Sequence, residues 1–257
     1  MLDQIIATKK EEIAALVLPE QAVVTNYSLY KALQNKNRSV GLIAEVKKAS
    51  PSKGVIQPNF DPVKTAIGYE KGGADAISVL TDIQYFQGSR DYITEIKKHV
   101  SIPVMRKDFI ISKEQIDETV RIGADAMLLI VGTVPTRELK ELYDYAYQNG
   151  LECLVEVHAK EELEELLDVF TPKIVGINNR NLKTFKTSLE QTKEMGEIVP
   201  KESLFVSESG ILTSEDVQTV LQAGANGILV GESLMRAASP EIGIHTLFGG
   251  EKIEANT

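Results

Sequence analysis

Five short runs of the sequence end in charged or amide side chains of the kind that perform acid–base chemistry. In each run an apolar or small residue stands two positions before the polar one. A strand alternates its side chains with a period of two, so each polar side chain shares a face with its apolar predecessor. The polar residues are Glu45 with Lys47, Lys107, Glu156, Asn178, and Glu208 with Ser209. Ammonium groups beside carboxylates predict general acid–base catalysis, with lysine able to protonate a carbonyl oxygen.

Loops rich in glycine and hydroxyl residues follow the first run and the last two strands of the predicted fold. The first loop is Ser50-Pro51-Ser52-Lys53-Gly54, and the others begin at Ser209-Gly210 and Gly231-Glu232-Ser233. Backbone N–H groups in such loops bind anions, as does the amino terminus of a short helix such as SLMRA. We expect a phosphate at the last two loops, with Ser50 or Lys53 closing the site. The alternative is that the glycines only permit tight turns.

The polar set also has a purely structural interpretation, a ring of ion pairs that stabilises the interior. Ion-pair networks do occupy polar interiors, so this interpretation competes for any one residue. Three carboxylates, two lysines and an amide that converge at one end favour a functional site instead. Burying any one of these charges in isolation would cost free energy, so charges crowded at one end of a fold must be paired or functional.

Strands whose ends meet are needed to bring these side chains together. From Gly41 onward, short apolar β-branched runs alternate with amphipathic helical segments. The predicted strands cover residues 41–47, 76–81, 102–107, 126–131, 151–157, 173–178, 203–208 and 226–231. The predicted helices cover residues 61–72, 89–99, 112–123, 135–149, 159–170, 188–198 and 213–224. Asp61-Pro62 and Val134-Pro135 place proline in a first turn, and Ser112 and Thr213 are predicted N-caps.

An internal repeat supports this alternation. GGADAISVL at 72–80, IGADAMLLI at 122–130 and AGANGILVG at 223–231 each predict a helix that ends at glycine, a tight turn and a buried strand. Eight alternating units imply parallel strands in a closed (β/α)8 TIM barrel, an α/β fold whose active site lies at the carboxyl ends of the strands. No GxGxxG follows a strand, which removes the main support for an open dinucleotide-binding sheet.

The helical spacing before Gly41 predicts an amino-terminal cap. Apolar residues from Leu2 to Val17 form one helix that ends before Pro19, and residues 27–34 form a second short helix. We therefore expect one domain over residues 1–257, with a helical extension over 1–40 and the barrel over 41–250.

Composition narrows the partners and the compartment. The chain has 257 residues and a formal charge of −9, which argues against nucleic acid or an anionic membrane as a partner. Its one cysteine, Cys153, is expected to be a buried structural thiol, and an intracellular, cytoplasmic location is the natural interpretation. His99, His158 and His245 lack metal-ligand spacing, so we expect surface or loop histidines and no metal site.

Eight motifs in order carry a family resemblance over nearly the whole chain. They are AEVKKASPSKG, LTDIQYFQGS, PVMRKDFI, LLIV, LVEVH, VGINNR, SESGI and ILVGESLM. With these motifs the sequence resembles the indole-3-glycerol phosphate synthases, barrel enzymes of tryptophan biosynthesis. The resemblance implies ring closure of 1-(2-carboxyphenylamino)-1-deoxyribulose 5-phosphate with loss of carbon dioxide and water. It implies a phosphorylated small-molecule substrate and no cofactor. We expect a monomer, with a weak homodimer as the alternative.

The resemblance also implies roles for individual residues. Lys107 resembles the general acid that protonates the keto oxygen, and Glu156 its partner in stabilising the cationic intermediate or in proton transfer. Glu45 and Lys47 are similar to the pair that serves the substrate carboxylate and the dehydration, with their division of acid and base roles left open. The remaining residues resemble a hydrogen-bonding wall (Asn178, Arg180, Glu208, Ser209), a ring-flanking pair (Phe86, Phe109) and a phosphate cradle (Ser50, Lys53, Gly210, Gly231 and the backbone N–H of Glu232).

Two other classes of protein compete with this interpretation. A sibling phosphate-binding barrel, such as phosphoribosylanthranilate isomerase or a Schiff-base aldolase, would share the fold. The isomerase would present a cysteine near the end of the first strand, whereas Cys153 lies in the fifth. An aldolase would be trapped by borohydride on Lys47 or Lys107. A non-catalytic metabolite-binding barrel would lack turnover.

Overall fold

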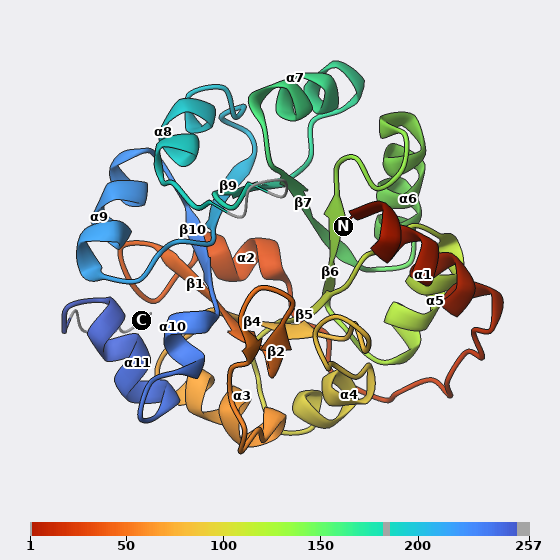
Figure 1. The fold of residues 1–257 in the computed structure, drawn as a ribbon, viewed down its shortest axis with the longest axis horizontal. Helices are drawn as coiled ribbons and strands as arrows, with labels where there is room; N and C mark the ends of the chain where they lie inside the picture. Colours follow the sequence, from red (N-terminus) through yellow and green to blue (C-terminus); the bar gives the residue numbers. More distant parts are fainter. Residues whose placement is uncertain (1, 182–185, 251–257) are drawn as a thin grey trace.

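Eight parallel strands close into a barrel within the part of the chain that the computed structural model describes, residues 2–181 and 186–250 (Figure 1). Around the barrel the strands follow the order β1-β10-β9-β8-β7-β6-β5-β4. Their bounds are β1 Gly41–Val46, β4 Ala76–Leu80, β5 Val104–Lys107, β6 Ala126–Ile130, β7 Glu152–Val157, β8 Ile174–Asn178, β9 Leu204–Glu208 and β10 Gly227–Val230. The predicted fold class is confirmed, and each of the eight predicted strands occurs. The part of the expected single domain that extends to residues 251–257 lies outside the described residues.

The predicted helices form the outer ring, and one helix that was not predicted completes it. The predicted set is α3 Pro62–Lys71, α4 Asp91–Lys97, α5 Lys113–Arg121, α6 Thr136–Gln148, α7 Lys160–Val169, α8 Glu190–Gly196 and α9 Ser214–Gln222. The additional helix, α11 Pro240–Leu247, packs against α3 and α9. Its start resembles that of α3, because Ser239 caps it and Pro240 occupies the first turn. The sequence therefore carried a signal for α11 that the prediction did not use.

Side-chain caps fix the helix starts largely as predicted. Asp61 accepts a hydrogen bond from the backbone N–H of Lys64, and Thr213 forms a capping box with Asp216. Ser112 caps α5 by accepting a hydrogen bond from the backbone N–H of Gln115. The prediction for Pro135 was wrong by one position, because this proline is the N-cap of α6 and Thr136 is its first helical residue.

Strand parity divides the core into two layers. The inner layer fills the barrel and contains Ile43, Met105, Leu154 and Val206, which are the apolar predecessors of the polar residues singled out in the sequence. The outer layer packs the opposite strand faces against the helices and contains Cys153. That thiol is buried and unpaired, as predicted, and burial raises its pKa.

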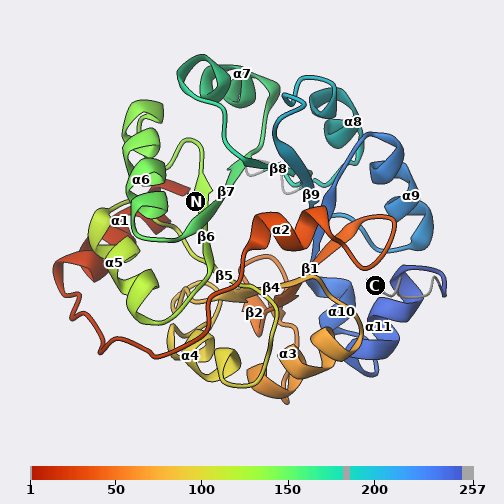
Figure 2. The ribbon, with the colours of Figure 1, turned by 180° about the vertical axis from the view of Figure 1, so that it is seen from behind.

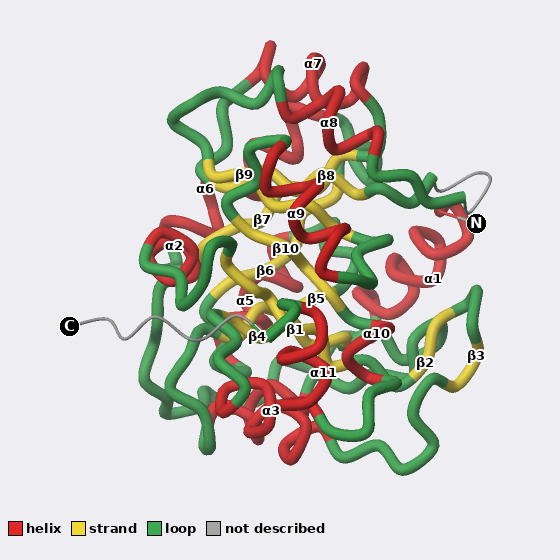
Figure 3. The backbone as a smooth tube through the Cα atoms, turned by 90° about the vertical axis from the view of Figure 1, so that its left-hand side faces the viewer, coloured by secondary structure: helices red, strands yellow, loops and turns green. Residues whose placement is uncertain are grey.

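The two amino-terminal helices close opposite ends of the barrel (Figure 3). Helix α2, Leu29–Gln34, lies across the amino-terminal end of the strands (Figure 2), where Leu29 and Leu33 are buried in the inner layer. Helix α1, Leu2–Ala14, lies at the carboxyl-terminal end of the strands, and its residues Leu2 and Ile5 line the cavity there. The predicted first helix was too long, because the chain leaves the helix after Ala14 and Val17 is exposed.

The repeated Gly-Ala-Asp/Asn turns hold neighbouring strands together at the closed end. Asp75 accepts a hydrogen bond from the backbone N–H of Leu42, and Asp125 accepts one from that of Val104. Asn226 accepts one from Phe205 at the equivalent position of the third repeat. Asp125 also accepts a hydrogen bond from the backbone N–H of Tyr27, so the same turns anchor the segment that carries α2.

A short antiparallel hairpin at the barrel mouth was not predicted. It pairs β2 Ala49–Ser50 with β3 Gly54–Val55, inside the loop that the sequence marked as turn-rich. Gly54 has a φ of +64°, which favours glycine at the reversal. The hairpin lies at the carboxyl-terminal end of the barrel strands (Figure 3). Its residues Ser50, Ser52 and Lys53 line the cavity at that end. Within residues 2–181 and 186–250, no helix combines the length and apolarity needed to cross a membrane.

Candidate active site

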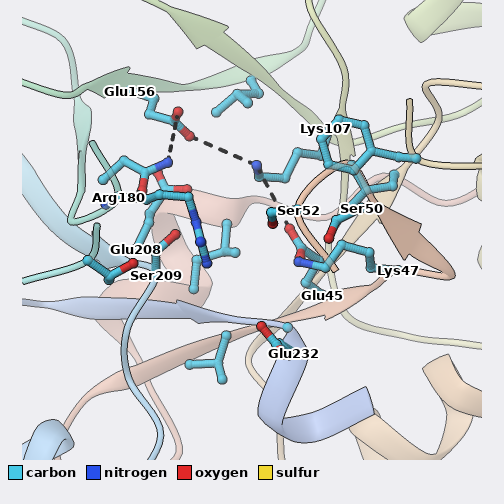
Figure 4. Close-up of a pocket in the computed structure, with 18 of the residues that line it drawn as sticks. Glu45, Lys47, Ser50, Ser52, Lys107, Glu156, Arg180, Glu208, Ser209 and Glu232 are labelled. Carbon is cyan, nitrogen blue, oxygen red and sulfur yellow. Dashed lines mark hydrogen bonds and ion pairs between the residues drawn. The ribbon is translucent and has the colours of Figure 1, made fainter. Parts of the chain in front are cut away.

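A cavity of about 570 Å³ opens at the carboxyl ends of the strands. This volume lies within the range of small-molecule sites. All residues that the sequence assigned to catalysis, substrate and phosphate line it, from every strand end singled out above and from the hairpin. Figure 4 shows side chains of both signs directed into this one space. The structure thus brings the predicted set together, and their individual roles remain predictions.

Lys107 lies between two buried carboxylates (Figure 4). Its Nζ is 3.8 Å from Oε2 of Glu45 and 4.0 Å from Oε2 of Glu156. Burial would lower the pKa of Lys107, but the charges of Glu156 and Glu45 outweigh it and raise that pKa above its usual value. The same attraction, together with Lys47, holds the pKa of Glu45 below its ordinary range in spite of burial. At neutral pH the resting site therefore holds a charged ammonium between two ionised carboxylates.

Glu156 and Glu208 are pushed toward opposite protonation states. Burial acts on both, but Glu156 is stabilised as an anion by Lys107 and His158, so its pKa is lowered. Burial and the negative charge of Glu156 raise the pKa of Glu208 well above its usual value. Asn178 Nδ2 donates a 3.1 Å hydrogen bond to Oε1 of Glu156, which fixes that carboxylate. Two carboxyl groups with separated pKa values can supply an acid and a base at one pH.

Two glycines make room for the carboxylates. A Cβ added at Gly231 would overlap Oε1 of Glu45, and one added at Gly176 would overlap Oε1 of Glu208. Lys47 donates a hydrogen bond to Oε1 of Glu45 on the other side. The close approach of backbone to carboxylate explains why glycine occupies position 176 in β8 and position 231 directly after β10.

An apolar wall faces the charged one. Phe86 and Phe109 have ring centroids 6.4 Å apart with an interplanar angle of 38°. Leu2 and Ile5 of α1 extend this wall. Such a surface suits a flat aromatic group placed beside the ionic cluster.

The far end of the cavity has the features of an anion site. Ser209 and Gly210 have φ values of +66° and +79°, and Asn179 Nδ2 donates a 3.0 Å hydrogen bond to the carbonyl oxygen of Ser209. The helix predicted in SLMRA occurs as α10, Glu232–Met235, and begins directly after Gly231. Lys53 reaches this end, where its Nζ lies 3.5 Å from Oε1 of Glu232.

The sequence predicted surface or loop histidines, and His158 does lie in the loop after β7, but it is buried at the site rather than at the surface. His99 and His245 are exposed, but His158 is buried in the cavity wall, with Nε2 2.9 Å from Oε1 of Glu156. Burial would lower the pKa of His158, yet Glu156 and Glu162 outweigh it and raise that pKa. A sequence signal existed, because His158 has the same parity as Glu156 and continues the inward face of β7.

The chain is similar to known proteins in sequence and in fold. A sequence model described as indole-3-glycerol phosphate synthase matches residues 2–247. Proteins named indole-3-glycerol phosphate synthase from Halalkalibacterium halodurans and Priestia megaterium are 62% and 60% identical to this chain. The first alignment covers 98% of both chains, and the second covers 97% of this chain and 98% of the relative. A crystal structure of 3-hexulose-6-phosphate synthase superposes with a TM-score of 0.65 at 16% identity, over 82% of this chain and 99% of the other, which shows the shared barrel fold.

Proposed function

The chain belongs to the indole-3-glycerol phosphate synthase family, and on that premise we propose how its side chains carry out the reaction. The enzyme converts 1-(2-carboxyphenylamino)-1-deoxyribulose 5-phosphate to indole-3-glycerol phosphate, with loss of carbon dioxide and water. The observation that carries the proposal is Lys107, held between Glu45 and Glu156 beside an apolar wall. This arrangement supports the role of Lys107 as the donor of a proton to the keto oxygen, with the aromatic ring of the substrate against Phe86 and Phe109.

The two ends of the cavity bind different groups of the substrate. The phosphate lies at the loops of Gly210 and Gly231, with Ser50 and Lys53 closing it, and the backbone N–H of Glu232 contributes at the start of α10. Arg180, which lines the cavity, meets the carboxylate of the substrate. Anchoring both ends holds the flexible ribulose chain in the bent form that ring closure requires, so binding energy remote from the reacting carbons promotes the reaction.

The charged side chains of the site are assigned to the chemical steps as follows. The Lys107 ammonium protonates the keto oxygen as the ring carbon attacks, and Glu156 stabilises the positive charge that develops on the substrate. Loss of carbon dioxide returns electrons to the ring. Dehydration protonates the new hydroxyl group and removes a proton from the neighbouring carbon, work assigned to Glu45 and Lys47. Neutral Glu208 can donate a hydrogen bond to the departing oxygen, alongside Asn178 and Ser209.

Product formation by the purified chain tests this function. The chain contains no tryptophan, so the protein contributes no indole fluorescence of its own to the signal of the product. We expect fluorescence to rise with time when the carboxyphenylamino ribulose phosphate is added. A chain that folds, binds this substrate and forms no indole would be a binding protein, and the proposal would fail.

The phosphate assignment has its own test in Gly231→Asp. A carboxylate at this position would repel a bound phosphate, and we expect at least a tenfold weaker affinity for the product, which corresponds to about 1.4 kcal/mol. Gly231→Ala is the matched control, because both variants crowd Glu45 but only one adds charge. Titration followed by indole fluorescence gives both dissociation constants. Equal affinity of the two variants would place the phosphate elsewhere.

A further inference from the structure

The cavity contains a buried histidine that the reaction described above does not use. His158 lies on the loop after β7, and its Nε2 is 2.9 Å from Oε1 of Glu156. Its backbone N–H donates a 2.7 Å hydrogen bond to Oε2 of Glu162 on α7, and Gln191 of α8 donates to its carbonyl oxygen. These two contacts hold the backbone of His158 from both sides. The arrangement is more than packing requires, because the ring is directed at the carboxylate that faces Lys107.

The charges around His158 favour the imidazolium form. Glu156 lies against Nε2, and Oε2 of Glu162 lies 3.8 Å from Nδ1. Lys107 is the opposing charge, on β5. Two carboxylates against one ammonium leave His158 with a pKa above its ordinary value, despite the burial that opposes it. An imidazolium at this position would hold its Nε2 proton next to Oε1 of Glu156.

The reaction consumes a proton in each turnover. The oxygen that leaves as water takes up two protons, and the carbon beside the nitrogen returns one, while the substrate carboxylate leaves as carbon dioxide without a proton. One proton must thus enter the site per product formed. With substrate in the cavity, solvent has restricted access to Lys107, whose side chain is 18% exposed even in the open site.

We propose that His158 is a positioning residue for Glu156 that also stores the proton consumed in each turnover. This inference rests on the proposed roles of Lys107 and Glu156. The N–H bond at Nε2 breaks, its electron pair stays on the nitrogen, and the proton joins Oε1 of Glu156. Rotation of the carboxyl group about χ3, a broad two-fold torsion, breaks the hydrogen bond from Asn178 that orients this group in the resting site, and presents the proton to the neutral amine of Lys107. After the product leaves, solvent entering the open cavity restores the proton on Nε2.

A pH profile of the single-turnover rate constant separates this role from a structural one. The stored proton is present only below the pKa of His158, so the wild-type rate constant should fall as the pH rises through that value. At pH values below the pKa of His158, we expect His158→Asn to lower the rate constant about tenfold. Its KM should stay within twofold of the wild-type KM. The fall of the rate constant at higher pH, called here the alkaline limb, should be absent in this variant. Added imidazole should restore part of the rate. His99→Asn, at an exposed histidine, is the control and should leave the profile unchanged.

A second pair of variants guards against misfolding of His158→Asn. Glu162→Gln removes one of the charges that favour the imidazolium. It should move the alkaline limb of the rate profile to lower pH by roughly half a unit and leave the maximal rate constant at low pH unchanged. Glu161→Gln, at the exposed neighbouring carboxylate, should leave the limb in place. The proposal would be overturned if His158→Asn lost rate equally at every pH and imidazole did not rescue it. It would also be overturned if Glu162→Gln left the alkaline limb in place. Failure of the wild-type enzyme to form product would instead refute the proposed function.

Discussion

Lys107→Ala is expected to lower kcat by about three orders of magnitude while substrate still binds. The variant removes the proton donor, and with it the positive charge that faces Glu45 and Glu156. Protonation of the keto oxygen is needed only as the ring closes, so the loss should appear in kcat and in kcat/KM alike. A factor of a thousand corresponds to about 4 kcal/mol of transition-state stabilisation.

The measurement is a steady-state assay of indole fluorescence, together with circular dichroism to establish that the variant is folded. Folding must be checked because Glu45 and Glu156 lose their common cation and are left facing each other at the bottom of the cavity. Lys98→Ala is the matched control, since Lys98 forms an exposed pair with Glu95 on α4, and it should keep wild-type turnover. Near-normal turnover of folded Lys107→Ala would remove Lys107 from its role as the acid.

The location of the site could be predicted because it depends on two local regularities. Strand parity, read from Ile43 to Glu45 or from Leu154 to Glu156, determines which face a side chain occupies. Barrel closure then brings the carboxyl ends of all strands to one mouth. Neither inference needs knowledge of how distant side chains contact one another, and so the sequence sufficed to collect the polar set.

The protonation states could not be predicted in the same way. Glu156 and Glu208 have the same residue type and equivalent strand positions, yet their pKa values move in opposite directions. The difference arises from Lys107 and His158, which lie against Glu156. The inward parity of His158 can be read from the sequence, but the contact between Glu156 and Lys107 joins two distant strands and has no local signature. The same limitation applies to α1, whose position over the mouth is fixed by an ionic cluster between distant segments.

That cluster is made of buried charges from α1 and from the loops after β4 and β5. Lys9 Nζ lies 2.7 Å from Oδ2 of Asp82 and 2.9 Å from Oδ1 of Asp108, and all three side chains are buried. Asp108 also pairs with Arg106 at 3.3 Å. Because Asp108 directly follows Lys107, the cluster joins the helix over the mouth to the strand that carries the proposed acid.

Asp108→Asn should therefore destabilise the fold by about 3 kcal/mol, since it leaves buried cations short of a carboxylate partner. The measurement is urea unfolding, with a lower midpoint and an unchanged slope. The matched control is Asp144→Asn, at a half-exposed pair with Lys140 on α6, which should change stability by no more than about 0.5 kcal/mol.

The difference in free energy of unfolding between wild type and Asp108→Asn should depend on pH, and this dependence identifies its cause. Burial would raise the pKa of Asp108, but Arg106 and Lys9 outweigh it and hold that pKa below its ordinary value. A carboxyl group with a lowered folded-state pKa stabilises the fold above its unfolded pKa of about 3.9, and the contribution is lost as the pH falls through the folded value. The difference in free energy of unfolding between wild type and Asp108→Asn should thus be largest at neutral pH and become smaller in acid. A difference that stayed constant down to the acid transition would mean that altered packing, rather than the lost charge, weakens the variant.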